Sequence, residues 1–194
     1  MKEFIDSLRN RRSIRFYLDK AVPFELVMKV IEAGTWAPSV HNLQPWFFVV
    51  VSGNNKNKIG KLLLEKKDNF SIGIKPVLTD AARIIDEVPI LIIGYNRKTL
   101  FKKFENLGLV YMEKATIFEI QSISCSFQNM QLMAYALGLG TTWLGIANFL
   151  GKEISKIVKE DKNEFFGMLA LGYPKEVPDK KKREDVSKIV KIIQ

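Results

Sequence analysis

The feature that most constrains this chain is a long stretch without charge, because no charged residue occurs between Glu119 and Lys152. In its first part, apolar residues recur at steps of three and four, which predicts one long helix from about Met112 to Leu137. A helix that lacks charge for so long is buried on most of its sides. Serines, glutamines and an asparagine interrupt the apolar run, so the helix is not expected to span a membrane.

The need to cover this helix bears on assembly. A chain of 194 residues is long enough for one sizeable core, and we expect one globular domain over residues 1–194. Burial of the uncharged helix is easier when a second subunit covers one of its faces, which favours a homodimer. A monomer with this helix at its centre is the alternative.

The remaining pattern predicts a chain of mixed strands and helices. Apolar or β-branched runs predict strands at residues 46–52, 88–95, 141–145 and 165–171. Amphipathic spacing predicts shorter helices at residues 2–10, 23–34 and 152–159, a lysine-rich surface helix around Ile59, and a last amphipathic segment at 186–193. Residues 97–103 are expected to be exposed. Between residues 65 and 86 the pattern is weak, which predicts an inserted, mobile loop.

A polar loop precedes the first predicted strand. Residues 37–46 place two prolines, Ser39, Asn42, Gln44 and the only histidine, His41, directly before a β-branched and aromatic run. The prolines restrict the backbone and the strand anchors its exit, so the loop can present N–H groups and small polar side chains to a ligand. An ordinary helix-to-strand connection is the alternative.

A basic cluster near the N-terminus is the second candidate site. Arg11, Arg12, Ser13 and Arg15 lie within five residues, and forked guanidinium groups beside a hydroxyl can give a phosphate several charge-assisted hydrogen bonds. Thirty Lys and Arg against twenty-one Asp and Glu give a net charge of +9, which favours anionic partners. A basic surface turn is the alternative.

Several kinds of chemistry are excluded by count. The single cysteine, Cys125, excludes an internal disulfide and a multi-cysteine metal site, which fits a reducing cytoplasm, and no signal peptide is expected. Nucleophilic catalysis would have to use His41, and there is no G-x-S-x-G elbow, Walker A loop or dinucleotide fingerprint. The difficult chemistry is therefore expected to belong to a bound, phosphate-bearing cofactor.

A series of segments resembles, in motif and order, the FMN-dependent nitroreductase family. They are Arg11-Arg12-Ser13-Ile14-Arg15-Phe16, Val22-Pro23, the loop from Ala37 to Trp46, Ser126-Phe127-Gln128-Asn129-Met130, Gly138-Leu139-Gly140 and Gly172-Tyr173-Pro174. The resemblance covers nearly the whole chain, although residues 53–87 match poorly. It implies an α+β fold with a nitroreductase-like mixed β-sheet packed by helices, and an intertwined homodimer with two flavin sites at the subunit interface.

The same resemblance implies the flavin contacts. The phosphate and ribityl chain of FMN would be held by Arg11, Arg12, Ser13 and Arg15, and the late basic residues closing on the phosphate would be Lys181 and Arg183. The partner subunit would line the isoalloxazine with Pro38, Ser39, Val40, Asn42 and Gln44. Backbone donors beside the reactive flavin nitrogen would be Leu144 and Gly145. Leu144 stands where several members carry an acidic residue, and the family's mid-chain Asn and Lys contacts cannot be placed.

The implied activity is hydride transfer from NADH or NADPH, through FMN, to a nitroaromatic, quinone or similar small-molecule acceptor by a ping-pong mechanism. No side chain is assigned a catalytic role, and no metal, nucleic acid or membrane partner is expected. A reductive dehalogenase or a flavin-fragmenting enzyme of the same fold is the first alternative. The others are a flavin-binding protein without turnover and, from the charge of +9, a basic nucleic-acid-binding module.

Overall fold

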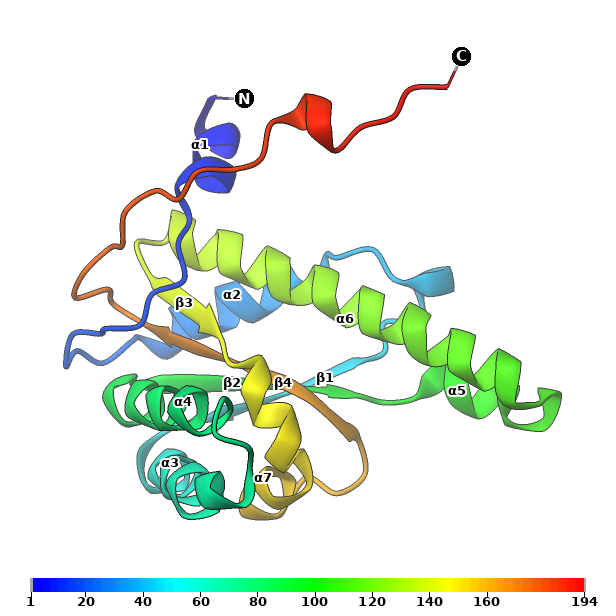
Figure 1. Ribbon diagram of the computed structural model, residues 1–194, viewed down its shortest axis with the longest axis horizontal. Helices are drawn as coiled ribbons and strands as arrows, with labels where there is room; N and C mark the ends of the chain where they lie inside the picture. Colours follow the sequence, from blue (N-terminus) through cyan, green and yellow to red (C-terminus); the bar gives the residue numbers. More distant parts are fainter. Residues whose placement is uncertain (1, 194) are drawn as a thin grey trace.

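The computed structural model describes residues 2–193 and has a four-stranded sheet at its centre (Figure 1). The strands are β1 (Trp46–Val51), β2 (Ile90–Asn96), β3 (Gly140–Trp143) and β4 (Glu164–Gly172), in the order β1-β2-β4-β3. All three pairings between strands are antiparallel. The predicted α+β fold is confirmed, and the parallel component of the sheet within residues 2–193 is the isolated bridge between Ser13 and Thr141.

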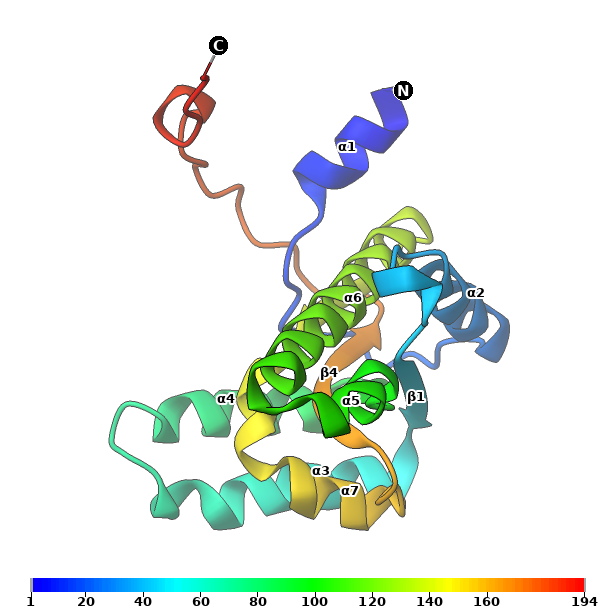
Figure 2. The same cartoon turned by 90° about the vertical axis from the view of Figure 1, so that its right-hand side faces the viewer.

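Helices cover both faces of this sheet (Figures 1 and 2). On one face lie α2 (Phe24–Thr35) and α6 (Leu109–Ala136), and on the other lie α3 (Gly53–Lys66), α4 (Lys75–Glu87) and α7 (Gly151–Val158). The other helical elements are α1 (Lys2–Asn10), α5 (Thr99–Phe104) and the short 3-10 turns η1 (Val40–Asn42), η2 (Lys67–Asn69), η3 (Glu105–Leu107), η4 (Gly145–Leu150) and η5 (Val186–Lys188). Residues 97–103 are not wholly exposed, because Leu100 of α5 is buried. Within residues 2–193, no helix combines the length and the apolar character needed to cross a membrane.

The long uncharged helix is confirmed as α6, but its protomer covers more of it than the sequence suggested. Ile123, Phe127 and Met130 are fully buried against α2 and the sheet. The opposite face is exposed, and Ile120 and Phe118 keep 44% and 40% of their surface accessible. The apolar surface open to a second subunit is therefore the outer face of α6, while Phe127 belongs to the core of the protomer.

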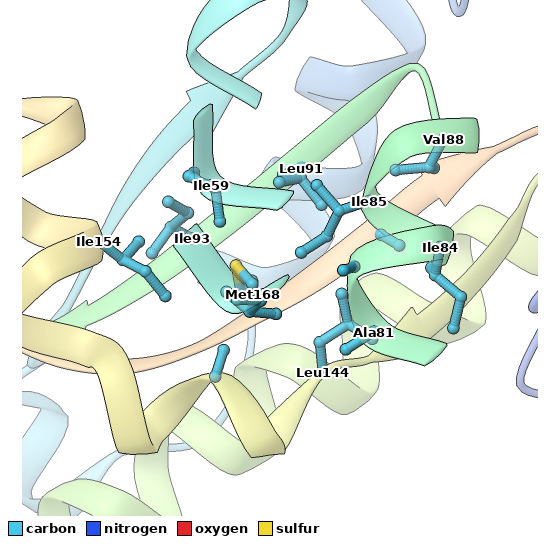
Figure 3. Close-up of a cluster of buried hydrophobic side chains, with 14 of the residues drawn as sticks. Ile59, Ala81, Ile84, Ile85, Val88, Leu91, Ile93, Leu144, Ile154 and Met168 are labelled. Carbon is cyan, nitrogen blue, oxygen red and sulfur yellow. The ribbon is translucent and has the colours of Figure 1, made fainter. Parts of the chain in front are cut away.

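The expected mobile loop at residues 65–86 is wrong, because most of this segment forms α4. Leu78, Ala81, Ala82 and Ile85 face the sheet at helical spacing, and small alanines let α4 lie close to α3. Figure 3 shows this side of the core, where Ile59 of α3 and Ile84 and Ile85 of α4 surround Leu91, Ile93 and Met168 of the sheet. Ile59 is therefore a core residue of α3, although this helix is lysine-rich on its outer side.

The C-terminal segment was expected to be amphipathic, but it has no buried face. Residues 186–188 form the short turn η5, and residues 186–193 are all exposed. Val186, Ile189 and Ile193 keep 67%, 64% and 83% of their surface exposed, and the segment extends away from the sheet and its helices (Figures 1 and 2). Its apolar side chains therefore lack a covering surface within the described chain.

Two glycines allow aromatic rings to lie directly on the sheet. Gly94 of β2 and Gly167 of β4 are register partners, and a Cβ built on Gly94 would lie 2.6 Å from Cε1 of Phe127. A Cβ on Gly167 would lie 2.9 Å from Nε1 of Trp143. The rings of Phe127 and Trp143 pack edge to face with centroids 4.9 Å apart.

We expect Gly94→Ala to lower the free energy of unfolding by about 1–3 kcal/mol, because the added Cβ would lie 2.6 Å from the buried Phe127 ring, which also packs against Trp143 and Phe166. Urea unfolding followed by circular dichroism measures the change. Gly73→Ala is the matched control, since nothing lies within 4 Å of a Cβ at that position. Equal stability of the two variants would show that the ring adjusts without cost.

Candidate functional site

A cleft of about 160 Å³ is formed where residues 11–15 lie beside residues 178–183. Its cations come from the segment after α1 and from the segment after β4. It is lined by Arg11, Arg12, Ser13, Arg15, Pro178, Asp179, Lys181 and Arg183. The structure thus brings together all six residues predicted for the phosphate, although the two groups lie at least 166 positions apart in the sequence.

The edge of the sheet fixes the N-terminal half of the cleft. The Ile14 amide donates to the Thr141 carbonyl at 2.9 Å, and the Ile14 side chain packs so closely on Gly140 that a Cβ there would lie 2.5 Å away. Tyr17, also buried, donates its hydroxyl hydrogen to the Ile14 carbonyl at 2.8 Å. Because Ile14 points into the core, its neighbours Ser13 and Arg15 point to the other side.

Like charges crowd this cleft. Burial, followed by the repulsion of Arg12 and Arg183, lowers the pKa of Arg11. Arg12 donates to the carbonyls of Arg9 and Arg11 at 2.8 and 2.7 Å, which holds its guanidinium near the end of α1. Five cationic side chains face one carboxylate, that of Asp179. A bound anion with two negative charges would relieve this repulsion and accept several of the remaining donors.

The predicted backbone donors lie at the end of β3, and one of them is already used. The Leu144 amide donates to the Met168 carbonyl at 2.8 Å, and the Leu144 side chain is buried in the core that Figure 3 shows. Gly145 opens η4, so its N–H has no partner within that turn. No heavy atom lies within 4 Å of a Cβ built on Gly145. Of the two residues, Gly145 therefore has the amide and the space for a ligand, while Leu144 anchors the turn.

The loop at residues 38–44 does not line this cleft of its own protomer. His41, Asn42 and Gln44 adopt positive φ angles of 48°, 52° and 48°. The Ser39 hydroxyl accepts the Gln44 amide at 3.1 Å, and the Ser122 hydroxyl of α6 accepts the Val40 amide at 3.2 Å. The loop is thus shaped by hydrogen bonds on the side of α6 and presents Pro38, Asn42 and Gln44 to solvent.

Residues 8–173 match the Nitroreductase family, which is most of the chain. The chain belongs to this family. The match extends from the basic cleft through the loop at 38–44 and α6 to the end of β4.

Individual relatives and solved structures are similar to this chain over most of its length. YfhC of Bacillus subtilis, provisionally named an NAD(P)H nitroreductase, is 28% identical over 188 residues, which covers 93% of this chain and 89% of that protein. The iodotyrosine dehalogenase 1 homolog of Caenorhabditis elegans is 30% identical over 207 residues, covering 97% of this chain and 61% of that protein. A solved structure from Desulfovibrio desulfuricans, described as a provisionally assigned nitroreductase in complex with FMN, has a TM-score of 0.76 at 24% identity and covers 98% of this chain and 96% of that one. The similarity to this solved structure shows that the chain has the same fold.

Three residues that surround the cleft were not singled out from the sequence. Asp179 lines it directly, Gln131 of α6 lies 3.5 Å from Nη1 of Arg11, and Arg83 of α4 contacts the backbone of Arg15. Arg83 was not predicted to lie near the cleft, because residues 65–86 were interpreted as a loop. The spacing of Leu78, Ala81, Ala82 and Ile85 was the signal that would have placed it on a helix.

Proposed function

We propose that this nitroreductase binds FMN and transfers a hydride from NADH or NADPH to a nitroaromatic, quinone or similar small acceptor. The observation that carries the proposal is the cleft that gathers Arg11, Arg12, Ser13 and Arg15 with Lys181 and Arg183. Family membership and the FMN described for the Desulfovibrio protein support the choice of cofactor. The assignment of NADH or NADPH as the electron donor is supported by the name given to YfhC.

The residues present fit the phosphate of FMN. Guanidinium forks and the Ser13 hydroxyl offer charge-assisted hydrogen bonds, and the mutual repulsion at Arg11 falls when a dianion is bound. The Gly145 amide is a candidate donor to the ring system, because it lacks a partner within its turn and faces open space. When bound, FMN would supply the two-electron redox chemistry, which no side chain of this protein offers.

We further propose a homodimer in which the loop at residues 38–44 serves the cleft of the partner subunit. This loop is ordered by Ser122 of α6, and the exposed apolar face of the same helix would form the contact between subunits. The exposed apolar residues of the C-terminal segment would gain cover in the same assembly. Pro38, Asn42 and Gln44 of one subunit would then contact the isoalloxazine ring of the FMN bound in the cleft of the partner subunit.

The visible absorption spectrum of the purified protein tests the cofactor assignment. We expect flavin absorption bands, and mass spectrometry of the molecule released on denaturation should identify FMN. A colourless protein that also takes up no added FMN would overturn the proposal. Consumption of NADH and NADPH with a nitroaromatic or a quinone as acceptor then tests the activity.

A reductive dehalogenase is the second candidate, favoured by the similarity to the iodotyrosine dehalogenase homolog. The two functions differ in the product that appears with a halogenated phenol. Release of halide at the expense of reductant would favour dehalogenation. Reduction of nitroaromatics and quinones without halide release would favour the first candidate.

Replacing His41 by Gln should leave turnover within about tenfold of the native rate, whereas loss of a general acid typically costs about 10²-fold or more. His41 is exposed on the loop, and solvent protons reach that position. Steady-state rates at saturating acceptor check the result, with FMN content measured in the same samples. A severe loss in a variant that keeps its FMN would make His41 catalytic.

Donor and acceptor are proposed to use the same space in turn, because the chain has no separate dinucleotide fingerprint. Double-reciprocal plots at several acceptor concentrations should therefore be parallel, as expected for a ping-pong mechanism. Intersecting lines would indicate that both substrates are bound together.

A further inference from the structure

Arg83 connects α4 to the N-terminal segment that carries Arg11, Arg12 and Arg15 of the cleft. Its Nη1 donates to the Arg15 carbonyl at 3.2 Å, across 68 positions of sequence. Its guanidinium carbon lies 4.3 Å from the centroid of the Phe16 ring. The Arg83 side chain of α4 therefore contacts two consecutive residues, Arg15 and Phe16.

The guanidinium of Arg83 is itself held in place on α4. Nε and Nη2 donate to Oδ1 of Asp80 at 3.2 and 2.6 Å, and Nη1 donates to Oε1 of Glu87 at 2.9 Å. Partial burial opposes the positive charge, but these hydrogen bonds outweigh it and raise the pKa of Arg83. α4 is anchored in turn by Ile84 and Ile85, which are buried in the core shown in Figure 3. The guanidinium that donates to the Arg15 carbonyl is therefore held in place by its own helix and by the core.

The same contacts argue that Arg83 is not a ligand for the phosphate. A guanidinium has five N–H donors, and the contacts with Asp80, Glu87 and Arg15 use four of them. Its single positive charge faces two carboxylates at hydrogen-bond distance. Arg83 does not line the basic cleft, whereas its contact residue Arg15 does.

We propose that Arg83, oriented by Asp80 and Glu87, is a positioning residue that fixes the backbone at Arg15 and Phe16 so that the Arg15 side chain faces bound FMN. This inference rests on the proposed FMN site. Without Arg83, the Arg15 carbonyl loses its donor and Phe16, already 39% exposed, loses the cation above its ring. The segment then keeps the hydrogen bond from the Ile14 amide to the Thr141 carbonyl and the one from the Lys175 amide to the Phe16 carbonyl, but the Arg15 carbonyl has lost the donor from Arg83.

A double-mutant cycle with FMN as the ligand tests the proposal. Flavin is removed from the full chain, and the dissociation constant for FMN is measured by fluorescence titration for the native protein, Arg83→Met, Arg15→Ala and the double variant. If Arg83 acts through Arg15, Arg83→Met should weaken FMN binding about tenfold in the native background and less than about threefold in the Arg15→Ala background. Equal losses in both backgrounds would overturn the proposal, since Arg83 would then act independently of Arg15.

Two further variants separate positioning from general damage. Arg83→Lys keeps one charged donor near the Arg15 carbonyl and should recover part of the lost affinity. Lys75→Met removes a cation from the same helix, where Lys75 pairs with Asp68 at 3.1 Å, and should leave FMN affinity unchanged. Thermal unfolding of each flavin-free variant checks the fold, and unchanged FMN affinity in a folded Arg83→Met would refute the inference. A native chain that binds no FMN would instead refute the proposed function.

Discussion

Replacing Arg11 by alanine should weaken FMN binding by about 10- to 100-fold, which corresponds to roughly 1.5–3 kcal/mol for a charge-assisted hydrogen bond to a dianion. Arg11 is half-buried in the basic cleft near Arg12 and Arg183, so its removal takes a charged donor away from a bound dianion. Riboflavin, which lacks the phosphate, should lose much less affinity. Fluorescence titration with both flavins measures the two effects in the same samples.

Lys180→Ala is the matched control for this experiment. Lys180 belongs to the same basic run as Lys181 and Arg183, but it does not line the cleft. Its removal should change FMN affinity by less than about threefold, as expected for an exposed charge. Equal losses of FMN and riboflavin in Arg11→Ala would show that Arg11 does not contact the phosphate.

Ile120→Asp should dissociate the proposed homodimer and abolish FMN binding at micromolar concentrations of the protein. Ile120 lies on the outer face of α6 with 44% of its surface exposed, so a carboxylate there does not disturb the core of the protomer. Within an interface between subunits it would be an unpaired buried charge, which costs several kcal/mol. Sedimentation velocity measures the mass, and the visible spectrum of the same fractions measures bound flavin.

Ile72→Asp makes the same chemical change at an isoleucine that is 88% exposed, in the connection between η2 and α4 and away from α6. This control should keep both its mass and its flavin. A monomeric Ile120→Asp that still binds FMN with native affinity would contradict a cofactor site shared between subunits. A native chain that sediments as a monomer would contradict the dimer itself.

Much of the fold was predictable because the signals were local and redundant. The uncharged run predicted α6, and the β-branched runs that begin at Trp46 and Val88 predicted β1 at one edge of the sheet and its neighbour β2. The phosphate cluster could also be proposed from the sequence, because Arg11, Arg12, Ser13 and Arg15 are neighbours. Its second half, Lys181 and Arg183, came from the family resemblance, since no local pattern says that a late basic run returns to the N-terminal segment.

The errors have identifiable physical causes. α4 was missed because its buried face uses two alanines, which contribute little to an apolar pattern although they suit close helix packing. The uncharged helix was expected to need cover from a second subunit, but Gly94 gives the Phe127 ring a place on the sheet of its own protomer. Leu144 was expected to donate its amide to a ligand, yet the register of β3 with β4 directs this amide to Met168. The last two contacts join residues far apart in the sequence, which no local pattern reveals.

The position of Lys181 and Arg183 has a consequence for how easily proteases cleave the protein. They lie on the segment that leaves β4 and leads to the exposed apolar residues from Val186 to Ile193. Any anion that they help to bind must, by thermodynamic linkage, hold this segment in place to the same extent that the segment holds the anion. Loss of the cofactor would therefore weaken the attachment of the C-terminal segment. A protomer that has lost its cofactor would in this way become a better substrate for proteases than a loaded one.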